Sequence, residues 1–361
     1  MLAVILKGKK EVAIETRPIP IIQDDRDIIV KVQYTALCGS ELHVFRGHQT
    51  TIPGFIMGHE FTGIIEQVGA LVKYLKPGDK IVSPFTVSCG ECFYCANGYS
   101  SRCDKSLLFG CPALDGAQAE YVRVPLAEST VFKAPCTIDS AKLCLMADIF
   151  PTGYFAAYNG LGKIDSLVAS QSVVVLIGCG PVGLCALIAA LEYKPKALLA
   201  IDRMNGRLDT ARDLGAEPWN FQTDCDAISR RVEELTEGRG ADIVIEVVGN
   251  SAALEMGFQL LRPWGTISSV GVHNGHIPWN GNQAYGKNLT IQMGRCPVRS
   301  IFPQALDLLE KKQHLLGFMT NTIMPLDEAV KGYEIFDAMK VHKVIFDAGK
   351  STKRLGKGEE V

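Results

Sequence analysis

The sequence has no long uninterrupted apolar run, no dense cluster of basic residues and no low-complexity segment. The first absence excludes a transmembrane helix, which needs about 20 consecutive apolar residues. The second argues against a nucleic-acid or anionic-membrane surface, because 37 Lys and Arg are balanced by 39 Asp and Glu. The apolar run within Met1 to Lys10 is too short for a signal peptide and favours a first strand. We therefore expect a cytoplasmic protein with no nucleic-acid or membrane partner.

The length of 361 residues exceeds the range of a single hydrophobic core, so two domains are expected. Up to residue 149 the chain consists of short β-rich runs broken by Gly and Pro, which is typical of a barrel-like β domain. Those runs are Ile28 to Val32, Gly63 to Val68, Lys80 to Val82 and Ala119 to Val124.

From residue 150 the pattern changes to alternating strands and helices, which predicts an α/β domain with a parallel sheet. The predicted strands are Val173 to Ile177, Ala197 to Ile201, Ile243 to Val247 and Thr266 to Val270, with helices starting at Val182 and Arg207. The Pro-, Gly- and Asn-rich stretch from Gly271 to Lys287 is expected to lead the chain out of this sheet. A helix near Phe302 to Lys312 and a strand near Lys343 to Phe346 are predicted to return to the first domain, and Gly356 to Val361 forms a polar tail.

Four cysteines follow one another in a C-x2-C-x2-C-x7-C arrangement: Cys89, Cys92, Cys95 and Cys103. Four thiolates at such short spacing form a closed tetrahedral cage for Zn2+, which leaves no open position and is therefore structural. The alternative is a set of scattered free cysteines or disulfides. Because twelve cysteines occur without an export signal, we expect a reducing compartment and no disulfides.

A glycine-rich turn follows the apolar strand that ends at Ile177, and it opens a helix. Its G-x-G-x-x-G sequence consists of Gly178, Cys179, Gly180, Pro181, Val182 and Gly183. Gly178 permits the tight turn, Gly180 lets the backbone approach a pyrophosphate, and Gly183 allows close helix packing. With both flanking elements in place, the turn predicts a Rossmann-type dinucleotide site.

Asp202 stands at the end of the next predicted strand, about 20 residues beyond the turn. A carboxylate there accepts hydrogen bonds from ribose hydroxyls and repels a 2′-phosphate, so NAD is favoured over NADP. Arg203 and Arg207 leave NADP open, because a nearby arginine accommodates that phosphate.

A second, open metal site is predicted in the first domain. Cys38 offers a thiolate and His59 an imidazole, and a third protein ligand would leave a fourth position for water or substrate. Each residue alone has an ordinary structural explanation, so this prediction depends on their combination with the zinc cage and the dinucleotide turn.

These motifs together resemble the zinc-dependent medium-chain alcohol dehydrogenases over essentially the whole chain. The segments that carry the resemblance, in order, are Cys38-Gly39-Ser40-Glu41-Leu42-His43, Gly58-His59-Glu60, the four-cysteine loop, Gly116-Ala117-Gln118-Ala119-Glu120-Tyr121 and the glycine turn. The resemblance implies a GroES-like catalytic domain over 1–149, a doubly wound Rossmann domain over 150–294 and a return to the catalytic domain over 295–361. It also implies an active site in the cleft between the two domains.

The same resemblance implies roles for individual residues. Cys38 and His59 match the first two catalytic zinc ligands, and Asp148 matches the third in the branch that holds glutathione-independent formaldehyde dehydrogenases and bacterial secondary-alcohol dehydrogenases. A helix cap is the alternative for Asp148. The glutamate matching Glu60 either stays outside the ligand set or binds zinc in place of water.

Ser40 and His43 match the two residues of a proton relay. The alternative for His43 is a surface histidine without a role in the reaction. Gly39 stands where some relatives have an arginine that binds pyrophosphate, so Lys343 and Arg207 become candidates for supplying that positive charge. The alternative for both is a solvated surface residue. Val270 completes the expected cofactor contacts. Gly294 to Arg299 matches a segment that approaches cofactor or substrate in relatives.

The predicted function is hydride transfer between an alcohol, or its aldehyde or ketone, and NAD, with two Zn2+ per chain. Alternatives on the same scaffold are aldehyde oxidation or dismutation with retained NAD, C=C reduction and polyol oxidation. A further alternative is a cofactor-binding scaffold that catalyses no reaction.

The substrate is expected to be a small molecule of unspecified identity. Candidate residues for its pocket, each of which is also a candidate for the hydrophobic core, are Phe45, Phe85, Phe109, Leu114 and Trp279. A homodimer or homotetramer is expected, with a strand near Ile267 to Val270 as its sheet edge.

Overall fold

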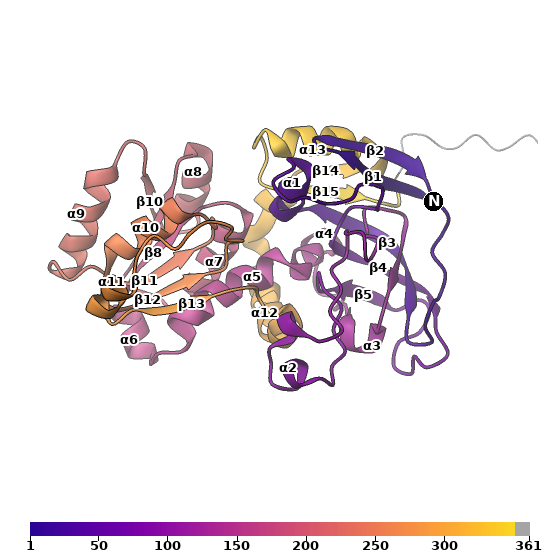
Figure 1. Cartoon of the computed structure of the whole chain (residues 1–361), viewed down its shortest axis with the longest axis horizontal. Helices are drawn as coiled ribbons and strands as arrows, with labels where there is room; N and C mark the ends of the chain where they lie inside the picture. Colours follow the sequence, from indigo (N-terminus) through magenta and orange to yellow (C-terminus); the bar gives the residue numbers. More distant parts are fainter. Residues whose placement is uncertain (351–361) are drawn as a thin grey trace, which may run out of the picture. The chain divides into compact units, whose positions relative to one another are not determined.

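The computed structural model describes residues 1–350 (Figure 1), so the predicted tail Gly356 to Val361 lies outside the described residues. The chain forms two compact units. Unit 1 contains Met1–Asp148 and the chain from Pro297 onward, whereas unit 2 is the continuous segment Ile149–Cys296.

Unit 1 is built on a seven-stranded sheet in which the order β14-β15-β3-β4-β5-β7 is extended by β6, which pairs with β3. A separate antiparallel hairpin, β1-β2, accompanies it. The strands are β1 (Leu2–Gly8), β2 (Glu11–Thr16), β3 (Ile28–Leu37), β4 (Glu60–Val68), β5 (Lys80–Ser83), β6 (Tyr121–Val124), β7 (Phe132–Lys133), β14 (Ile323–Pro325) and β15 (Val344–Asp347). Strands far apart in sequence are therefore neighbours, since β15 pairs antiparallel with β3.

The helices of unit 1 are mostly short and join the strands. They are α1 (Gly39–Phe45), α2 (Phe93–Ala96), α3 (Ala127–Thr130), α4 (Ser140–Leu143), α12 (Val298–Lys312) and α13 (Ala329–Asp337). A 3-10 segment, Cys144–Ala147, follows α4 and ends at Asp148. The longest helix, α12, buries one apolar face that includes Phe302 and Leu309.

Unit 2 contains a six-stranded, wholly parallel sheet in the order β10-β9-β8-β11-β12-β13, the doubly wound order of a Rossmann fold. Its strands are β8 (Val173–Ile177), β9 (Ala197–Asp202), β10 (Glu217–Asn220), β11 (Ala241–Glu246), β12 (Leu261–Ser269) and β13 (Thr290–Met293). Its helices are α5 (Ile149–Ala157), a π-helical segment (Tyr158–Gly162), α6 (Ser166–Gln171), α7 (Pro181–Leu191), α8 (Asn205–Asp213), α9 (Cys225–Thr236), α10 (Ser251–Leu260) and α11 (Gly281–Lys287).

Both faces of this sheet are covered. Every residue of β8 is buried, so alternate side chains point into two cores. One core joins Val173 and Val175 to Ile228 of α9 and Leu254 of α10. Helices α5 and α7 pack together on the sheet as well. The continuous apolar run of β8 is thus explained by burial from both sides.

Two expectations for the end of unit 2 were wrong. The stretch from Gly271 to Lys287 does not lead the chain out of the sheet, because it contains α11 and is followed by a sixth strand, β13. Asn280 begins α11 with a capping box to Gln283. The strand near Ile267 to Val270 is not a sheet edge either, since β12 lies between β11 and β13.

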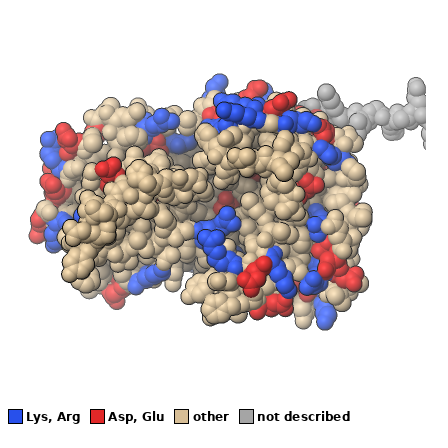
Figure 2. All heavy atoms as spheres, in the orientation of Figure 1, with Lys and Arg blue, Asp and Glu red and all other residues tan. Residues whose placement is uncertain are grey.

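Basic and acidic side chains are interspersed over the face seen in Figure 2, in keeping with the near-zero net charge. Within residues 1–350, no helix has both the length and the apolarity needed to cross a bilayer.

Candidate metal centres and cofactor site

The four sulfur atoms of Cys89, Cys92, Cys95 and Cys103 lie within 4.8 Å of one another in unit 1. Backbone amides point at them: the N–H of Cys89 donates to Cys103 Sγ at 3.2 Å, and that of Cys92 donates to Cys89 Sγ at 3.3 Å. Hydrogen bonds from backbone amides, first that of Asp104, lower the pKa of Cys92 to about 6. A set of four convergent thiolates supported by N–H donors fits a tetrahedral Zn2+.

A second set in unit 1 consists of Cys38, His59, Glu60 and Asp148, whose potential ligand atoms also lie within 4.8 Å of one another. Cys38 is the N-cap of α1, His59 directly precedes β4, and Asp148 follows the 3-10 segment. The Asp148 Oδ2 atom lies 3.6 Å from Cys38 Sγ and 3.4 Å from His59 Nε2. One thiolate, one imidazole and one or two carboxylates form a donor set suited to Zn2+.

Glu41 contacts two members of this set, and sequence reasoning did not single it out. Its Oε2 accepts the N–H of Cys38 at 2.8 Å, and its Oε1 accepts the N–H of His59 at 3.2 Å. The same Oε1 lies 3.2 Å from His59 Nδ1, which leaves Nε2 facing Asp148. A carboxylate on the outer nitrogen of a ligand histidine fixes its orientation. The signal was available, since Glu41 is the third residue of a helix that Cys38 caps.

Glu60 forms an ion pair with Lys343, and both side chains are wholly buried. Lys343 binds Oε2, whereas Oε1 has no hydrogen-bond partner. Although burial disfavours the ammonium, the charge of Glu60 raises the pKa of Lys343. Burial also raises the pKa of Glu60 to about 7, against the opposing charge of Lys343. Glu60 is therefore a member of the group around Cys38 that has one carboxylate oxygen without a hydrogen-bond partner. Lys343 as a pyrophosphate ligand stays a prediction.

The electrostatics of Cys38 and His59 reflect their burial. Burial opposes a charged His59, but the charge of Glu41 and the hydrogen bonds that the ring donates to Asp148 and Cys38 raise the pKa of His59 well above its usual value. Burial, followed by the charge of Glu60, raises the pKa of the Cys38 thiol. A thiol, an imidazole and two carboxylates buried side by side are costly even with Lys343 against Glu60, and a bound metal cation would relieve that cost.

Ser40 and His43 are both on α1, one turn apart and so on the same helix face. The hydroxyl of Ser40 lies 3.4 Å from His59 Nε2, which puts it beside the metal-ligand set. His43 is half-buried, with its ring 5.9 Å from that of His48. Burial, then the charges of His48 and Arg46, lower the pKa of His43, so the ring is neutral at pH 7.

The glycine turn of unit 2 lies between β8 and α7. Gly178 has φ +97°, and a Cβ on Gly183 would stand 1.8 Å from the Gly178 carbonyl oxygen, so both positions require glycine. A Cβ on Gly180 would meet only the Arg207 guanidinium, at 3.7 Å. This open approach at the helix N-terminus, with Pro181 and Val182 in the first turn and no acidic residue there, fits a pyrophosphate.

Asp202 ends β9 and is buried against the turn. Its Oδ2 accepts the N–H of Cys179 at 2.8 Å, and its Oδ1 accepts those of Arg203 and Met204 at 2.7 and 2.9 Å. The Arg207 guanidinium lies 3.8 Å from Oδ2, whereas the Arg203 side chain is exposed. Val270 follows β12 and is half-buried, its N–H donating to the Glu246 carbonyl. The structure therefore brings Asp202 and Arg207 to the glycine turn.

The candidate pocket residues are mostly core residues. Phe45, Phe109 and Leu114 belong to the buried core of unit 1, and Trp279 stacks on Phe258 in unit 2. Phe85 differs, because its ring meets that of His59 edge-on at 6.0 Å. Phe85 is thus the candidate that contacts the metal-ligand set.

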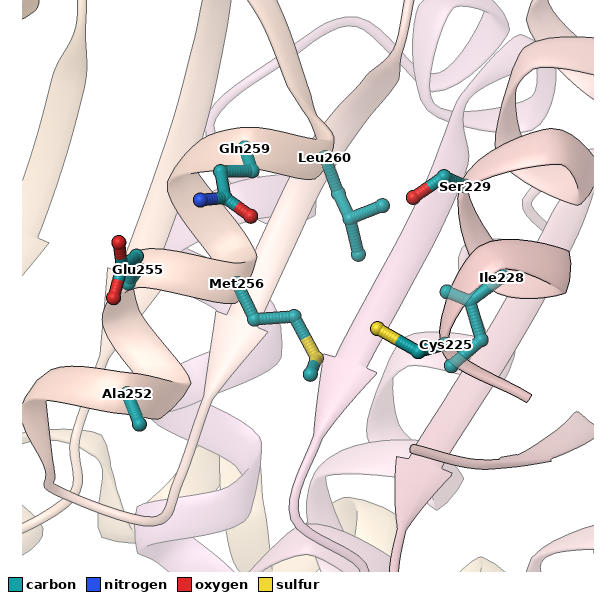
Figure 3. A pocket seen from close by; sticks show the side chains of 8 residues that line it. All are labelled: Cys225, Ile228, Ser229, Ala252, Glu255, Met256, Gln259 and Leu260. Carbon is teal, nitrogen blue, oxygen red and sulfur yellow. The ribbon is translucent and has the colours of Figure 1, made fainter. Parts of the chain in front are cut away.

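A separate cavity of about 320 Å³ lies between α9 and α10 of unit 2. Figure 3 shows the sulfur atoms of Cys225 and Met256 pointing into it from the two helices. No residue of the glycine turn or of either metal-ligand set lines this cavity. It is therefore distinct from the predicted site.

Two family models match different parts of this chain, and known proteins match most of its length. Residues 24–136 match the family described as alcohol dehydrogenase GroES-like domain, and residues 181–311 match zinc-binding dehydrogenase. The zinc-type alcohol dehydrogenase B of Aspergillus flavus is 66% identical over 97% of this chain and 82% of its own length. A medium chain reductase/dehydrogenase of Acremonium sp. is 52% identical over 79% of this chain and 98% of its own length. Among solved structures, the alcohol dehydrogenase TADH from Thermus sp. ATN1 superposes with a TM-score of 0.88 at 34% identity, covering 96% of this chain and 99% of that one.

Proposed function

Because this chain belongs to the zinc-type alcohol dehydrogenase family and is therefore an oxidoreductase, we propose that it transfers a hydride between an alcohol and NAD at a zinc held by Cys38, His59 and Asp148. The observation that carries this proposal is the convergence of these three donors, from distant parts of the sequence, on one point of unit 1. A non-catalytic scaffold has no need of such a set.

A Zn2+ at this site supplies a Lewis acid that lowers the pKa of an alcohol and stabilises negative charge on its oxygen. Glu41 holds Cys38 and His59 in position by accepting hydrogen bonds from both. Glu60 adds a further carboxylate to the set, and Lys343 restrains that carboxylate by donating to Oε2. Phe85 closes one side of the His59 ring with an apolar surface.

The proton released in alcohol oxidation is assigned to Ser40 and His43. The Ser40 hydroxyl is near His59 and is able to pass a proton, and His43 follows on the same face of α1. His43 is neutral at pH 7, because burial and neighbouring cations lower its pKa, so it accepts that proton. In carbonyl reduction the same two residues return it.

The cofactor is assigned to the glycine turn of unit 2. The open space over Gly180 and the free amides at the start of α7 support pyrophosphate binding there. Asp202 supports NAD, since its carboxylate stands where the ribose of a dinucleotide is read. Arg207, which lies between Asp202 and Gly180, supplies the positive charge for the phosphates.

The assignment is tested with purified, zinc-loaded protein. Cys38→Ser should lower the zinc content from two ions per chain to one and abolish NAD reduction across a panel of primary, secondary, benzylic and polyhydroxy alcohols. Cys136→Ser is the matched control, because Cys136 is a free and exposed cysteine. Full zinc content and full turnover in Cys38→Ser would refute the ligand set.

The same panel separates the remaining reactions on this scaffold. NAD reduction with one alcohol class defines the substrate class, including polyols. NAD that stays bound during purification, together with activity on aldehydes alone, would indicate oxidation or dismutation with retained cofactor. Comparison of NAD with NADP in the Arg207→Ala variant shows whether that arginine serves the shared phosphates or a 2′-phosphate.

We assign the four-cysteine set to a second, structural Zn2+, supported by the geometry of its sulfurs. A homodimer or homotetramer is supported by β13, an edge strand whose four side chains are all exposed. A cytoplasmic location stays our proposal, made from the twelve cysteines of the sequence and the reducing compartment that they suit.

A further inference from the structure

The four-cysteine loop is attached to helix α12, which comes from the far end of the sequence (Figure 1). Ser300 on the first turn of α12 donates its hydroxyl to Ser100 Oγ at 3.0 Å. The N–H of Ser100 lies 3.4 Å from the same Ser300 oxygen. Ser100 is buried and stands between Cys95 and Cys103. The loop that carries the last two cage sulfurs is therefore fastened to the start of this helix.

Arg299 makes a second connection at the same place. Its guanidinium lies 4.3 Å from the centroid of the Phe132 ring, and Phe132 is stacked on Phe302 with centroids 3.9 Å apart and planes 4° apart. Burial lowers the pKa of Arg299, and the negative charge of Cys95 opposes that effect. Arg299 is thus a half-buried cation next to Ser300, which contacts the cage loop, and its guanidinium lies on an aromatic stack that ends in the buried face of α12.

A cation at this position would offset negative charge on the metal-loaded cage. Four thiolates around one divalent ion leave net negative charge on the cage. The nearby ammonium of Lys105 is already paired with Glu91 at 2.7 Å. Arg299 differs because its guanidinium is partly buried against Phe132, where its attraction to the charge of a metal-loaded cage is less screened. Charge on the cage therefore draws the start of α12 toward the loop.

The opposite end of this connection is the second metal-ligand set. Helix α12 packs both on the Ser100–Arg102 segment of the cage loop and on the 3-10 segment Cys144–Ala147. All four residues of the latter are buried, and Asp148 follows directly. The position of Asp148 depends on that segment, which one side of α12 supports.

We propose that Arg299 is a positioning residue that balances the charge of the metal-loaded cage and, with Ser300, holds α12 where it supports Asp148, so that the cage controls metal retention at the Cys38–His59–Asp148 site. This inference rests on the proposed function only in taking these three residues as ligands. In this proposal, the metal in the four-cysteine set holds Asp148 in the position where it binds the other metal.

The test follows zinc release from the full-length, zinc-loaded protein into a chelating dye. Two phases are expected, and the Cys38→Ser variant identifies the phase of the second site by lacking it. Arg299→Met should accelerate that phase by about tenfold, the effect typical of residues that orient a metal ligand. Arg299→Lys, which keeps the charge, should restore most of the parent rate.

Lys287→Met is the matched control, because Lys287 also lies over an aromatic ring, 4.6 Å from the centroid of Phe258, but in unit 2. It should leave both phases unchanged. Ser300→Ala keeps the cation and removes the contact with Ser100, and should accelerate the second-site phase less than Arg299→Met does. Amide exchange within residues 144–148 should rise in both variants, a readout independent of turnover.

Three outcomes would overturn the inference. If Arg299→Met released zinc from the second site at the parent rate, Arg299 would have no effect on the position of Asp148. The same conclusion would follow if only the release phase of the cage were faster. Equal effects of Arg299→Lys and Arg299→Met would remove the role of charge. A parent protein that releases only one Zn2+ per chain would instead refute the proposed second metal site itself, so the two failures are distinguishable.

Discussion

Glu60 and Lys343, separated by 283 positions in the sequence, form a hydrogen-bonded ion pair with no solvent exposure. Strand pairing produces this contact, since β3 lies between β4, which begins at Glu60, and β15, which begins directly after Lys343. A buried ion pair gives modest net stability, but removal of one partner leaves a buried charge without compensation. The pair therefore connects the residue that precedes β15 to the candidate metal site.

Lys343→Met should lower the free energy of unfolding of unit 1 by about 3 kcal/mol, because Glu60 would remain buried and unpaired. Adding Glu60→Gln should recover most of that loss. Urea unfolding of the two single variants and the double variant measures the coupling, and strictly additive losses would show that the pair is not an energetic unit.

Glu41→Gln should weaken zinc binding at the second site by about tenfold or more, because a neutral amide holds the Cys38 amide and His59 ring less firmly than a carboxylate. Competition with a chelator of known affinity measures this. Glu66→Gln is the control, since Glu66 is an exposed glutamate on β4. Equal zinc affinity in the two variants would contradict the orienting role of Glu41.

His43→Gln should reduce alcohol oxidation by about a hundredfold, the lower range for loss of an acid-base group. In the parent protein the rate should fall as pH decreases through the pKa of His43, because only the neutral ring accepts the proton. That limb should lie below the range of a free histidine, since burial, His48 and Arg46 all lower this pKa. The pH profile of turnover tests both points, and an unchanged acid limb in His43→Gln would assign it to another group.

Gly183→Ala should abolish cofactor binding, because its Cβ would overlap the Gly178 carbonyl oxygen and force the glycine turn apart. Gly206→Ala on α8 is the control, since a Cβ there meets nothing within 4 Å and a helical alanine is favoured by up to about 1 kcal/mol. Quenching of protein fluorescence by NADH provides the measurement. Tight NADH binding in Gly183→Ala would mean that the cofactor lies elsewhere.

Local patterns were the most predictable parts of the molecule. Val173–Ile177 was predicted with its true bounds, because a wholly apolar run between turn signals has few other interpretations. The four cysteines and the glycine turn were found in the same way, since their chemistry depends on spacing within a short segment. Strand β13 was missed because its four side chains are all exposed, and only pairing with β12 makes it a strand.

Contacts between distant segments were beyond such reasoning. Lys343 looked like a candidate for phosphate because nothing near it in sequence reveals Glu60, which only the sheet brings to it. Arg299 is likewise an ordinary arginine until α12 is packed on the cage loop. Glu41 was within reach, since its helix-capping position is local, but its contact with His59 is not.

The division of the chain also orders events during synthesis. Unit 2 is one continuous segment, so it is complete once Cys296 has left the ribosome. Unit 1 remains without α12, β14 and β15 until the chain beyond unit 2 is made, and Glu60 stays without Lys343 for the same time. A chain that stops after unit 2 would therefore contain the complete parallel sheet together with an antiparallel sheet that lacks β14 and β15.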